Sequence, residues 1–402
     1  MPRLIFMTAN DLRKNLWPEL ALPALARHGW EITVVGINAE ESAMARCLPY
    51  PCRRHNLTSL SQGRLSSELD IARWLQHCRT GPYDVIYLHS HVLGSRAGLG
   101  LIGPLFGKRL IYHTHDYFDP ITHPLHMRLE AITAQRSSYF INGEYHRGYI
   151  CRTMYKLRSP MLVLPPNLPA AFPVSLYSDK VRVEMGARDP KDILLIVHGG
   201  QSSLRATDET LEALSLLPNR FRLVMTGERT SSLVKKLEML AIADRVVCLG
   251  HLEYAALLSY TASADIGIML HANNDLGNFF QAPGRLTEYL ACGLPILASH
   301  YTALQLLTLK YRVGLCVDPN SAREIASALL EMETAIHSGR FGRKAIREAF
   351  LDHFAFDHWE GAVIQVFDSL SDRHRTYRDH PPDFGKLGVP FCSVPLTDES
   401  RE

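Results

Sequence analysis

The sequence lacks the features by which several classes of protein are recognised. Its 402 residues carry 43 basic and 41 acidic side chains, and a net charge of +2 argues against a bulk nucleic-acid binder. The eight cysteines are scattered without a Cys-x-x-Cys spacing, so neither a zinc site nor a disulfide framework is indicated, and a reducing compartment fits best. No run of ~18 apolar residues exists. The apolar run at the amino terminus is too short for a signal peptide. We therefore expect a cytoplasmic protein, with any membrane contact being peripheral at the inner face.

The chain is long enough for two domains, because a single core seldom grows beyond ~250–300 residues. Short apolar runs alternate with helical patterns, which is typical of parallel α/β units. We expect strands at 3–7, 31–36, 85–88, 109–112, 138–141, 193–197, 221–225, 245–248, 266–269 and 296–298, with a helical pattern over 16–27. The predicted organisation is an N-terminal Rossmann-like domain (1–166), a linker (167–183), a C-terminal Rossmann-like domain (184–352), a helix (353–370) that can cross back to the first domain, and a polar tail (371–402).

The segment 281–298, QAPGRLTEYLACGLPILA, is the most informative part of the chain. A Pro-Gly pair ends the preceding loop, and a helix is expected from about Arg285 to Gly293, where glycine suits a left-handed cap. The start of a helix offers free backbone N–H groups that suit a phosphate. Glu288 lies one turn beyond Arg285 on the same face, where a carboxylate can accept two ribose hydroxyls. The alternative is an ordinary helix–strand unit. The segment resembles the nucleotide-sugar signature of retaining glycosyltransferases with the GT-B fold, especially glycosyltransferase family 4.

A glycine-rich loop, HGGQSSLR at 198–205, follows the expected strand 193–197. The paired glycines Gly199 and Gly200 let the backbone approach a ligand closely, and Arg205 can reach into the loop. The loop matches neither the dinucleotide fingerprint nor a P-loop, which argues against NAD and ATP. It resembles the family 4 loop that is followed by a phosphate-gripping arginine. Taken alone, the loop is better explained as a tight turn with a solvated arginine, but the segment 281–298 follows about eighty residues later, as the family pattern requires.

The resemblance implies a GT-B fold with a cleft between an acceptor-binding N-terminal domain and a donor-binding C-terminal domain. It implies transfer of a sugar from a nucleotide-diphosphate-sugar, most simply of the UDP type, to a hydroxyl of a small-molecule or lipid-linked saccharide acceptor. Retention of configuration, no cofactor and no metal are implied as well. The oligomeric state is not predicted. The implied donor contacts are Gly199, Gly200, Glu228, His251, Asn274, Asn278, Gly284, Leu286 and Glu288.

One departure from the family pattern concerns the donor sugar. Many members carry a second glutamate eight positions before the one that matches Glu288, and Phe280 occupies that position here. The Asn-rich loop 271–280 resembles a subgroup in which asparagines, here Asn274 or Asn278, contact the sugar. Two alternatives therefore stay open: a nucleotide-sugar-binding protein without transferase activity, and a UDP-sugar epimerase of GT-B fold.

In the N-terminal half, the sequence HTHD at 113–116 ends an expected strand and resembles the strand-end His-Asp pair of the family. Two histidines beside an aspartate could also hold a metal ion, but ligands on alternating positions rarely converge on one ion, so no metal is expected. His89 ends the preceding strand. The implied catalytic residues are His115, Asp116, Arg205 and Arg285, and the implied acceptor-side residues are Asp11, Arg13, His91 and His113.

Overall fold

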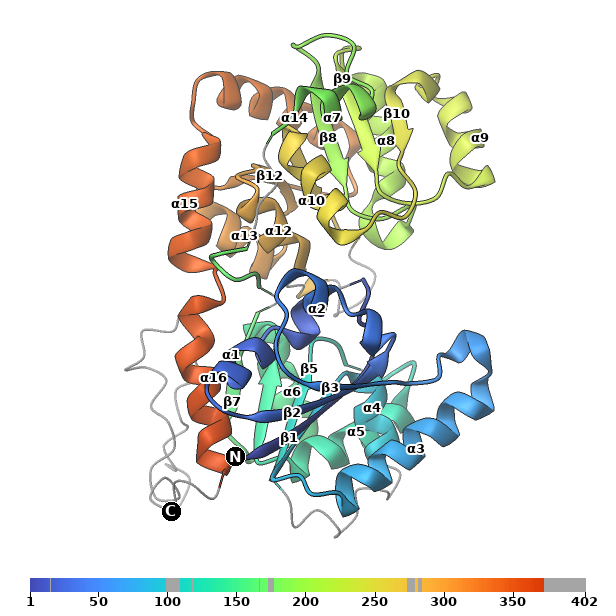
Figure 1. Cartoon of the computed structure of the whole chain (residues 1–402). Coiled ribbons are helices and arrows are strands. Elements are labelled where there is room, and N and C mark those ends of the chain that lie inside the picture. Colours follow the sequence, from blue (N-terminus) through green and yellow to red (C-terminus); the bar gives the residue numbers. More distant parts are fainter. Residues whose placement is uncertain are drawn as a thin grey trace, which may run out of the picture. The chain divides into compact units, whose positions relative to one another are not determined.

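The computed structural model describes residues 1–14, 16–98, 109–117, 119–165, 167–172, 177–272, 279–280 and 284–371. The chain divides into two compact units (Figure 1), the first made of Met1–Pro166 and the chain from Phe356 on, the second of Asn167–Ala355. No helix among the described residues is long and apolar enough to cross a membrane.

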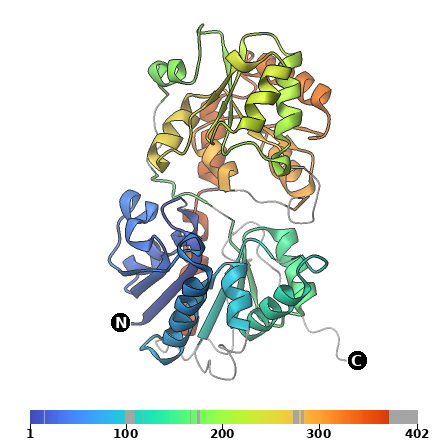
Figure 2. The ribbon, with the colours of Figure 1, turned by 90° about the vertical axis from the view of Figure 1, so that its right-hand side faces the viewer.

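The N-terminal domain is built on a seven-stranded sheet in the order β3-β2-β1-β4-β5-β6-β7, and all of its pairings are parallel. Its strands are β1 (Arg3–Asp11), β2 (Glu31–Ile37), β3 (Arg53–Asn56), β4 (Val85–His89), β5 (Arg109–Thr114), β6 (Tyr139–Asn142) and β7 (Met161–Val163). Its α-helices are α1 (Leu22–Arg27), α2 (Ala43–Cys47), α3 (Arg64–Thr80), α4 (His91–Gly98), α5 (Pro124–Arg136), α6 (Tyr145–Tyr155) and α16 (Asp357–Leu370). In Figure 2, α3 and α4 lie on the near face of this sheet and α16 on the far face. Strand β4 is buried throughout, as expected for a parallel strand covered on both faces.

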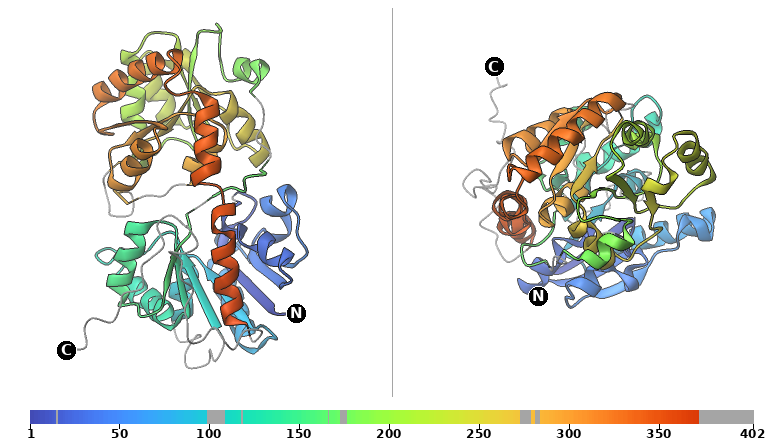
Figure 3. Two further views of the ribbon diagram at one scale, coloured as in Figure 1. Left: turned by 90° about the vertical axis from the view of Figure 1, so that its left-hand side faces the viewer. Right: turned by 90° about the horizontal axis from the view of Figure 1, so that it is seen from above.

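Helix α16 returns to the N-terminal sheet although it follows the second unit in sequence (Figure 3). The Phe367 ring packs against the rings of Tyr87 on β4 and Trp30, with centroids 5.3 and 6.0 Å apart. The indole N–H of Trp30 also donates to Asp368, and Arg27 at the end of α1 pairs with Glu360 at 2.9 Å. The core of the N-terminal domain therefore depends on a helix from the end of the chain.

The C-terminal domain contains a six-stranded sheet in the order β10-β9-β8-β11-β12-β13, again with parallel pairings. Its strands are β8 (Ile193–Val197), β9 (Phe221–Met225), β10 (Val246–Cys248), β11 (Ile266–Met269), β12 (Ile296–Ser299) and β13 (Gly314–Val317). Its α-helices include α7 (Asp179–Glu184), α8 (Thr207–Leu216), α9 (Ser231–Met239), α10 (Tyr254–Ser263), α12 (Gly284–Ala291), α13 (Thr302–Lys310), α14 (Ala322–His337) and α15 (Arg343–His353). After α12, Gly293 has φ +68°, so the predicted left-handed glycine cap is confirmed.

Two features differ from the sequence-based expectation. The helical pattern at 16–27 is divided into a 3₁₀ turn (Trp17–Glu19) and α1, each with a proline in its first turn. Proline has no N–H and its ring clashes with the carbonyl four residues earlier, so it is accommodated only at a helix start. Strands β3, β7 and β13 were not among the expected strands. All three are edge strands of three or four residues, and β3 reads Arg-Arg-His-Asn, which has no apolar run.

Both sheets reverse their strand order at one point, between β1 and β4 in the first domain and between β8 and β11 in the second. In open parallel sheets, ligands bind beyond the carboxyl ends of the strands at such a switch point. Each domain therefore has one switch point, and a ligand-binding site is expected in the loops around it.

Candidate functional site

At the switch point of the C-terminal domain, two arginines converge on one backbone carbonyl. The Arg205 guanidinium donates to the His198 carbonyl through Nη1 at 2.8 Å, and Arg285 Nη1 lies 3.4 Å from the same oxygen. Nη2 of Arg285 is 2.8 Å from Nε2 of His271, which follows β11. Among the described residues, neither arginine has a carboxylate at ion-pair distance, so two positive charges share neutral acceptors.

Arg285 is buried, and this determines its electrostatics. Burial, together with the charge of Arg205, lowers the pKa of Arg285 from 12.5 to about 10. A guanidinium in such a place is costly unless an anion accompanies it. The two arginines therefore form a site prepared for a negatively charged group.

Glycines bring the backbone of two loops to this site. Gly199 has φ +109°, and a Cβ atom there would lie 1.8 Å from Nη1 of Arg205. A Cβ atom on Gly227, after β9, would lie 2.3 Å from the Cα atom of Gly200. Only glycine allows this conformation and this approach, so backbone atoms of the loops after β8 and β9 lie beside the arginine pair.

Glu288 lies on α12 with both carboxylate oxygens engaged. One oxygen accepts a hydrogen bond from the Tyr254 hydroxyl at 2.8 Å, and the other is 3.1 Å from Nδ1 of His198. Since a carboxylate only accepts, Nδ1 of His198 carries the hydrogen. Burial alone would raise the pKa of Glu288, but the hydrogen bonds from His198 and Tyr254 and the charge of Arg285 outweigh it, and the pKa is lowered. Glu288 is thus held ionised, with lone pairs left for further donors.

The other expected donor contacts lie in different surroundings. Gly284 begins α12. The side chain of Leu286 is buried, so this residue can contact a ligand only with its backbone atoms. Glu228 and His251 are both exposed, with a separation of 3.9 Å between their nearest charged atoms. Asn274 and Asn278 lie outside the described residues.

In the N-terminal domain, Arg147 holds the turn after β5. Its Nη1 donates to the Asp116 carboxylate at 2.9 Å and to the carbonyl of His115. His113 is buried, with Nδ1 2.6 Å from the Tyr87 hydroxyl, so its ring faces the interior of the domain.

His91 begins α4, and burial lowers its pKa. The Asp11 carboxylate at the end of β1 accepts hydrogen bonds from the exposed Arg13 side chain at 3.2 Å and from Asn38 at 3.0 Å. Burial acts to raise the pKa of Asp11, but these bonds outweigh it and lower the pKa.

Three residues of the C-terminal site were missed by the sequence argument. His198 donates to Glu288 and carries the carbonyl on which both arginines converge, Tyr254 binds Glu288, and His271 binds Arg285. His198 stands directly before the Gly-Gly pair, which is a signal that could have identified it. The sequence offers no comparable signal for Tyr254, because its contact with α12 depends on tertiary packing.

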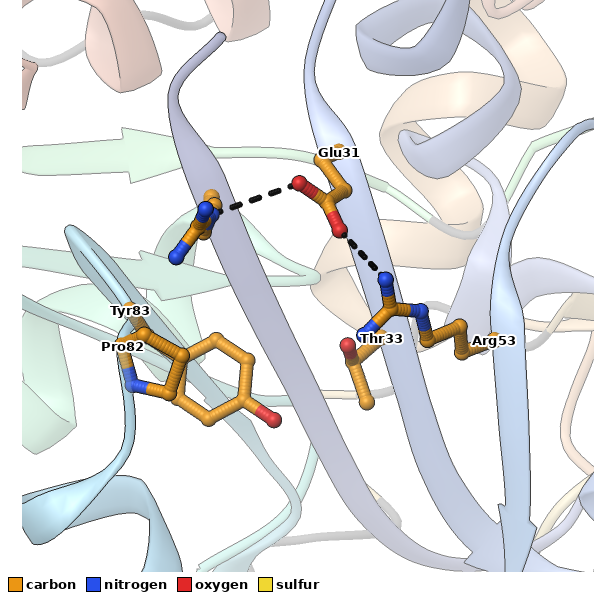
Figure 4. Close-up of a pocket in the computed structure, with 6 residues that line it drawn as sticks. Glu31, Thr33, Arg53, Pro82 and Tyr83 are labelled. Atoms are coloured by element: carbon orange, nitrogen blue, oxygen red, sulfur yellow. Dashed lines mark ion pairs between the residues drawn. The ribbon is translucent and has the colours of Figure 1, made fainter.

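A small pocket lies at the opposite end of the N-terminal sheet, where β1, β2 and β3 begin (Figure 4). Its lining residues are Arg3, Glu31, Thr33, Arg53, Pro82 and Tyr83. Glu31 pairs with Arg3 at 3.3 Å and with Arg53 at 3.1 Å, so each charged group of the pocket already has an ion-pair partner within it. Because this end of a parallel sheet is remote from the switch point, the pocket is not part of the candidate site.

Part of the chain is similar in sequence to known glycosyltransferases. Residues 193–334, from β8 into α14, match the family described as Glycosyl transferases group 1. A D-inositol 3-phosphate glycosyltransferase of Xylanimonas cellulosilytica is 28% identical over 195 residues, which is 46% of this chain and 44% of that protein. The aligned region thus spans less than half the length of that relative.

Solved structures resemble nearly the whole chain. A sucrose-phosphate synthase from Thermosynechococcus elongatus superposes with a TM-score of 0.70 at 16% identity, covering 92% of this chain and 99% of that one. HepE of Anabaena in complex with UDP and glucose has a TM-score of 0.69 at 17% identity, with 92% and 100% covered. WaaG, a glycosyltransferase involved in lipopolysaccharide biosynthesis, has a TM-score of 0.66 at 15% identity, with 90% and 99% covered.

These likenesses define the class of protein. The chain has two Rossmann-like domains with parallel sheets and the GT-B fold, as the sequence predicts. Within that class, the family match over 193–334 and the aligned relative support a GT-B glycosyltransferase.

Proposed function

We propose that the protein is a glycosyltransferase that moves a sugar from a nucleotide-diphosphate-sugar to an acceptor hydroxyl, with retention of configuration and without a metal ion. UDP is the favoured nucleotide, because HepE, a structural neighbour, is known in complex with UDP-glucose. The observation that carries the proposal is the arginine pair of the C-terminal domain, which shares the His198 carbonyl without a carboxylate partner among the described residues.

The chemistry required is stabilisation of a departing diphosphate while positive charge develops on the sugar. Arg205 and Arg285 supply fixed positive charge in a largely buried place, where it acts more strongly than in water. Glu288 is held ionised by direct hydrogen bonds from His198 and Tyr254 and is proposed to bind the ribose hydroxyls. The leaving phosphate oxygen takes the proton of the acceptor hydroxyl on the face from which it departs. His115 is proposed to orient the donor sugar.

A pair of variants tests the phosphate assignment. Arg205→Ala and Arg285→Ala are each expected to lower turnover by ~10²–10³-fold, the scale for loss of one preorganised charge-stabilising group. Arg340→Ala is the matched control, because Arg340 lies in the same domain in an exposed ion pair with Glu331. Near-normal turnover of both site variants in folded protein would contradict the assignment.

Product analysis distinguishes the proposed reaction from its alternatives. A panel of nucleotides is first screened by thermal shift, since a ligand of the folded state raises apparent stability by mass action. The matching nucleotide-sugars are then incubated with candidate saccharide acceptors. Free nucleoside diphosphate with a glycosylated acceptor of unchanged anomeric configuration supports the proposal. An epimerised donor, binding without turnover, or an inverted product would each contradict it.

A further inference from the structure

Three histidines meet at the switch point of the N-terminal domain. His89 ends β4 and is paired in register with Thr8 on β1 and with His113 on β5. His115 follows β5, two residues after His113, so both rings can project to one side of the strand. One ring nitrogen from each of His89, His113 and His115 lies within 4.8 Å of the others. We call these three residues the histidine triad.

The triad has nitrogens without partners. Among the described residues, Nε2 of His89, Nε2 of His113 and both ring nitrogens of His115 are buried with no hydrogen-bond partner. Buried polar atoms are nearly always satisfied, because an unsatisfied one has lost its hydrogen bonds to water without replacing them. Four such atoms at one switch point therefore indicate a ligand that binds there from outside the chain.

The other nitrogens of two triad rings are held by hydroxyls. Nδ1 of His89 is 2.9 Å from the Thr8 hydroxyl, and Nδ1 of His113 is 2.6 Å from the Tyr87 hydroxyl. When Nδ1–H donates to these oxygens, the lone pair of each ring is left on Nε2, the nitrogen that has no partner among the described residues. A second hydrogen bond of this kind fixes the tautomer and orientation of metal-binding histidines.

Neighbouring groups also restrain the triad. The Trp17 ring covers it, with centroids 4.2 Å from the His115 ring and 5.1 Å from the His89 ring. Ser90, directly after His89, has φ +94°, which is unfavourable for a residue with a side chain, and its N–H donates to the His113 carbonyl at 2.9 Å. Strain of this kind persists only where the surroundings enforce it. The backbone next to His89 is therefore held in place.

We propose that the histidine triad binds one divalent transition-metal ion, of the zinc class, through three imidazole nitrogens. A hydroxyl has one hydrogen to donate and cannot satisfy three lone pairs, whereas a metal ion accepts all of them. Imidazole suits zinc, copper and nickel, while magnesium and calcium prefer oxygen ligands. Three histidines leave the fourth position of a tetrahedral site for water or another ligand.

The geometry requires only a small adjustment. Zinc lies ~2.0–2.1 Å from its nitrogen ligands, which places the nitrogens of a tetrahedral site ~3.4 Å apart. The triad nitrogens lie within 4.8 Å of one another, so an ion has to draw them together by at most ~1.4 Å. The ion would engage His115, to which the proposed function assigns the donor sugar, so it is expected to inhibit transfer. In this one respect the inference rests on the proposed function.

Metal binding is tested without any substrate. Zn²⁺ or Co²⁺ alone is titrated into the chelator-treated full chain, with calorimetry for Zn²⁺ and the visible absorption of Co²⁺ as readouts. We expect one ion per chain and a Co²⁺ spectrum typical of tetrahedral coordination. His113→Ala should weaken binding at least ~100-fold, and Tyr87→Phe, which leaves all three ligands in place, by ~10–100-fold.

The control addresses binding at the protein surface. His123 and His126 form another close histidine pair, with ring centroids 6.2 Å apart. The double variant His123→Ala/His126→Ala should keep the affinity and the Co²⁺ spectrum. The proposal is overturned if no ion binds, or if binding survives His113→Ala and disappears in the double variant. Should His113→Ala not fold, unchanged affinity in Tyr87→Phe would overturn it equally.

An activity measurement separates this inference from the proposed function. Added Zn²⁺ should lower turnover, a chelator should restore it, and Tyr87→Phe should shift the inhibition to higher Zn²⁺ concentration. If no transferase activity exists, the binding measurements still decide the metal site. If transfer occurs but no ion binds, the inference alone fails.

Discussion

Replacing Arg285 by methionine should stabilise the ligand-free C-terminal domain while weakening nucleotide binding. Burial and the charge of Arg205 lower the pKa of Arg285 from 12.5 to about 10. At 1.36 kcal/mol per pKa unit, the charged form costs the folded state ~3 kcal/mol. Since the folded-state pKa is the lower one, this cost is fully present below about pH 10 and is relieved as the pH rises from about 10 toward 12.5. At neutral pH, Arg285→Met avoids the full cost of burying the charged guanidinium.

The gain is partly offset by lost hydrogen bonds. Arg285 gives up its contacts with Nε2 of His271 at 2.8 Å and with the His198 carbonyl at 3.4 Å, each of which contributes ~1 kcal/mol. The remaining stabilisation is ~1 kcal/mol, which for a domain of this size raises the melting temperature by ~2–4 °C. Arg285→Met should therefore melt slightly above the wild type when no ligand is present.

Nucleotide binding should change in the opposite direction. A nucleoside diphosphate at a concentration of 100 Kd stabilises the wild type by ~2.7 kcal/mol. Loss of charge-assisted hydrogen bonds should raise Kd by up to ~100-fold. The same ligand concentration then stabilises Arg285→Met by only ~0.4 kcal/mol. The ligand-free variant is thus the more stable protein, and the ligand-bound wild type overtakes it.

Differential scanning calorimetry with and without the best nucleotide of the panel measures both effects, and calorimetric titration gives Kd. Arg340→Met is the control, because Arg340 and its partner Glu331 are exposed and such pairs contribute little. It should change neither quantity. A melting temperature several degrees below the wild type, together with intact nucleotide binding, would refute the reasoning and make Arg285 an ordinary structural arginine.

Three further predictions concern the same domain and one concerns metal. Glu288→Gln should weaken nucleoside diphosphate binding by ~10–100-fold in a calorimetric titration, because charge-assisted hydrogen bonds to the ribose are lost; equal affinity would exclude that role. Gly227→Ala should weaken it ~10-fold, because the new Cβ atom meets the backbone of the neighbouring loop, whereas Gly342→Ala, whose nearest contact is at 3.7 Å, should not. Asn278→Ala should lower kcat/KM for the nucleotide-sugar but leave the affinity for the bare nucleoside diphosphate unchanged. Asn274→Ala tests the alternative alignment. If both variants show wild-type kcat/KM, the loop does not contact the sugar. Transfer should survive EDTA, and a loss that Mg²⁺ or Mn²⁺ reverses would contradict this.

Much of the C-terminal domain could be predicted because its signals are local. Strands β8, β9 and β11 coincide with the expected ranges 193–197, 221–225 and 266–269, since each is a short apolar run next to turn residues. The start and end of α12 followed from a Pro-Gly pair and a glycine cap. The edge strand β3 was missed because its sequence, Arg-Arg-His-Asn, is mostly exposed and has no apolar pattern.

The candidate site was predicted as a set of residues but not as an arrangement. Arg205 and Arg285 were identified by their loop and helix positions, yet their shared acceptor, the His198 carbonyl, depends on β8 and β11 being neighbours. The same dependence hid the bond between Tyr254 and Glu288. Contacts between residues far apart in sequence require the strand order, which no local pattern contains.

The histidine triad makes the same argument for the N-terminal domain. Alternating histidines on one strand rarely surround an ion, so the sequence argument expected no metal there. The third ring comes from β4, which pairs in parallel register with the next strand along the chain, β5. The reversal of strand order between β1 and β4 places the Thr8 hydroxyl beside His89, while the pairing of β4 with β5 places the Tyr87 hydroxyl beside His113. In both domains the candidate residues come together where the strand order reverses, so knowledge of the strand order would have joined the separate motifs into sites.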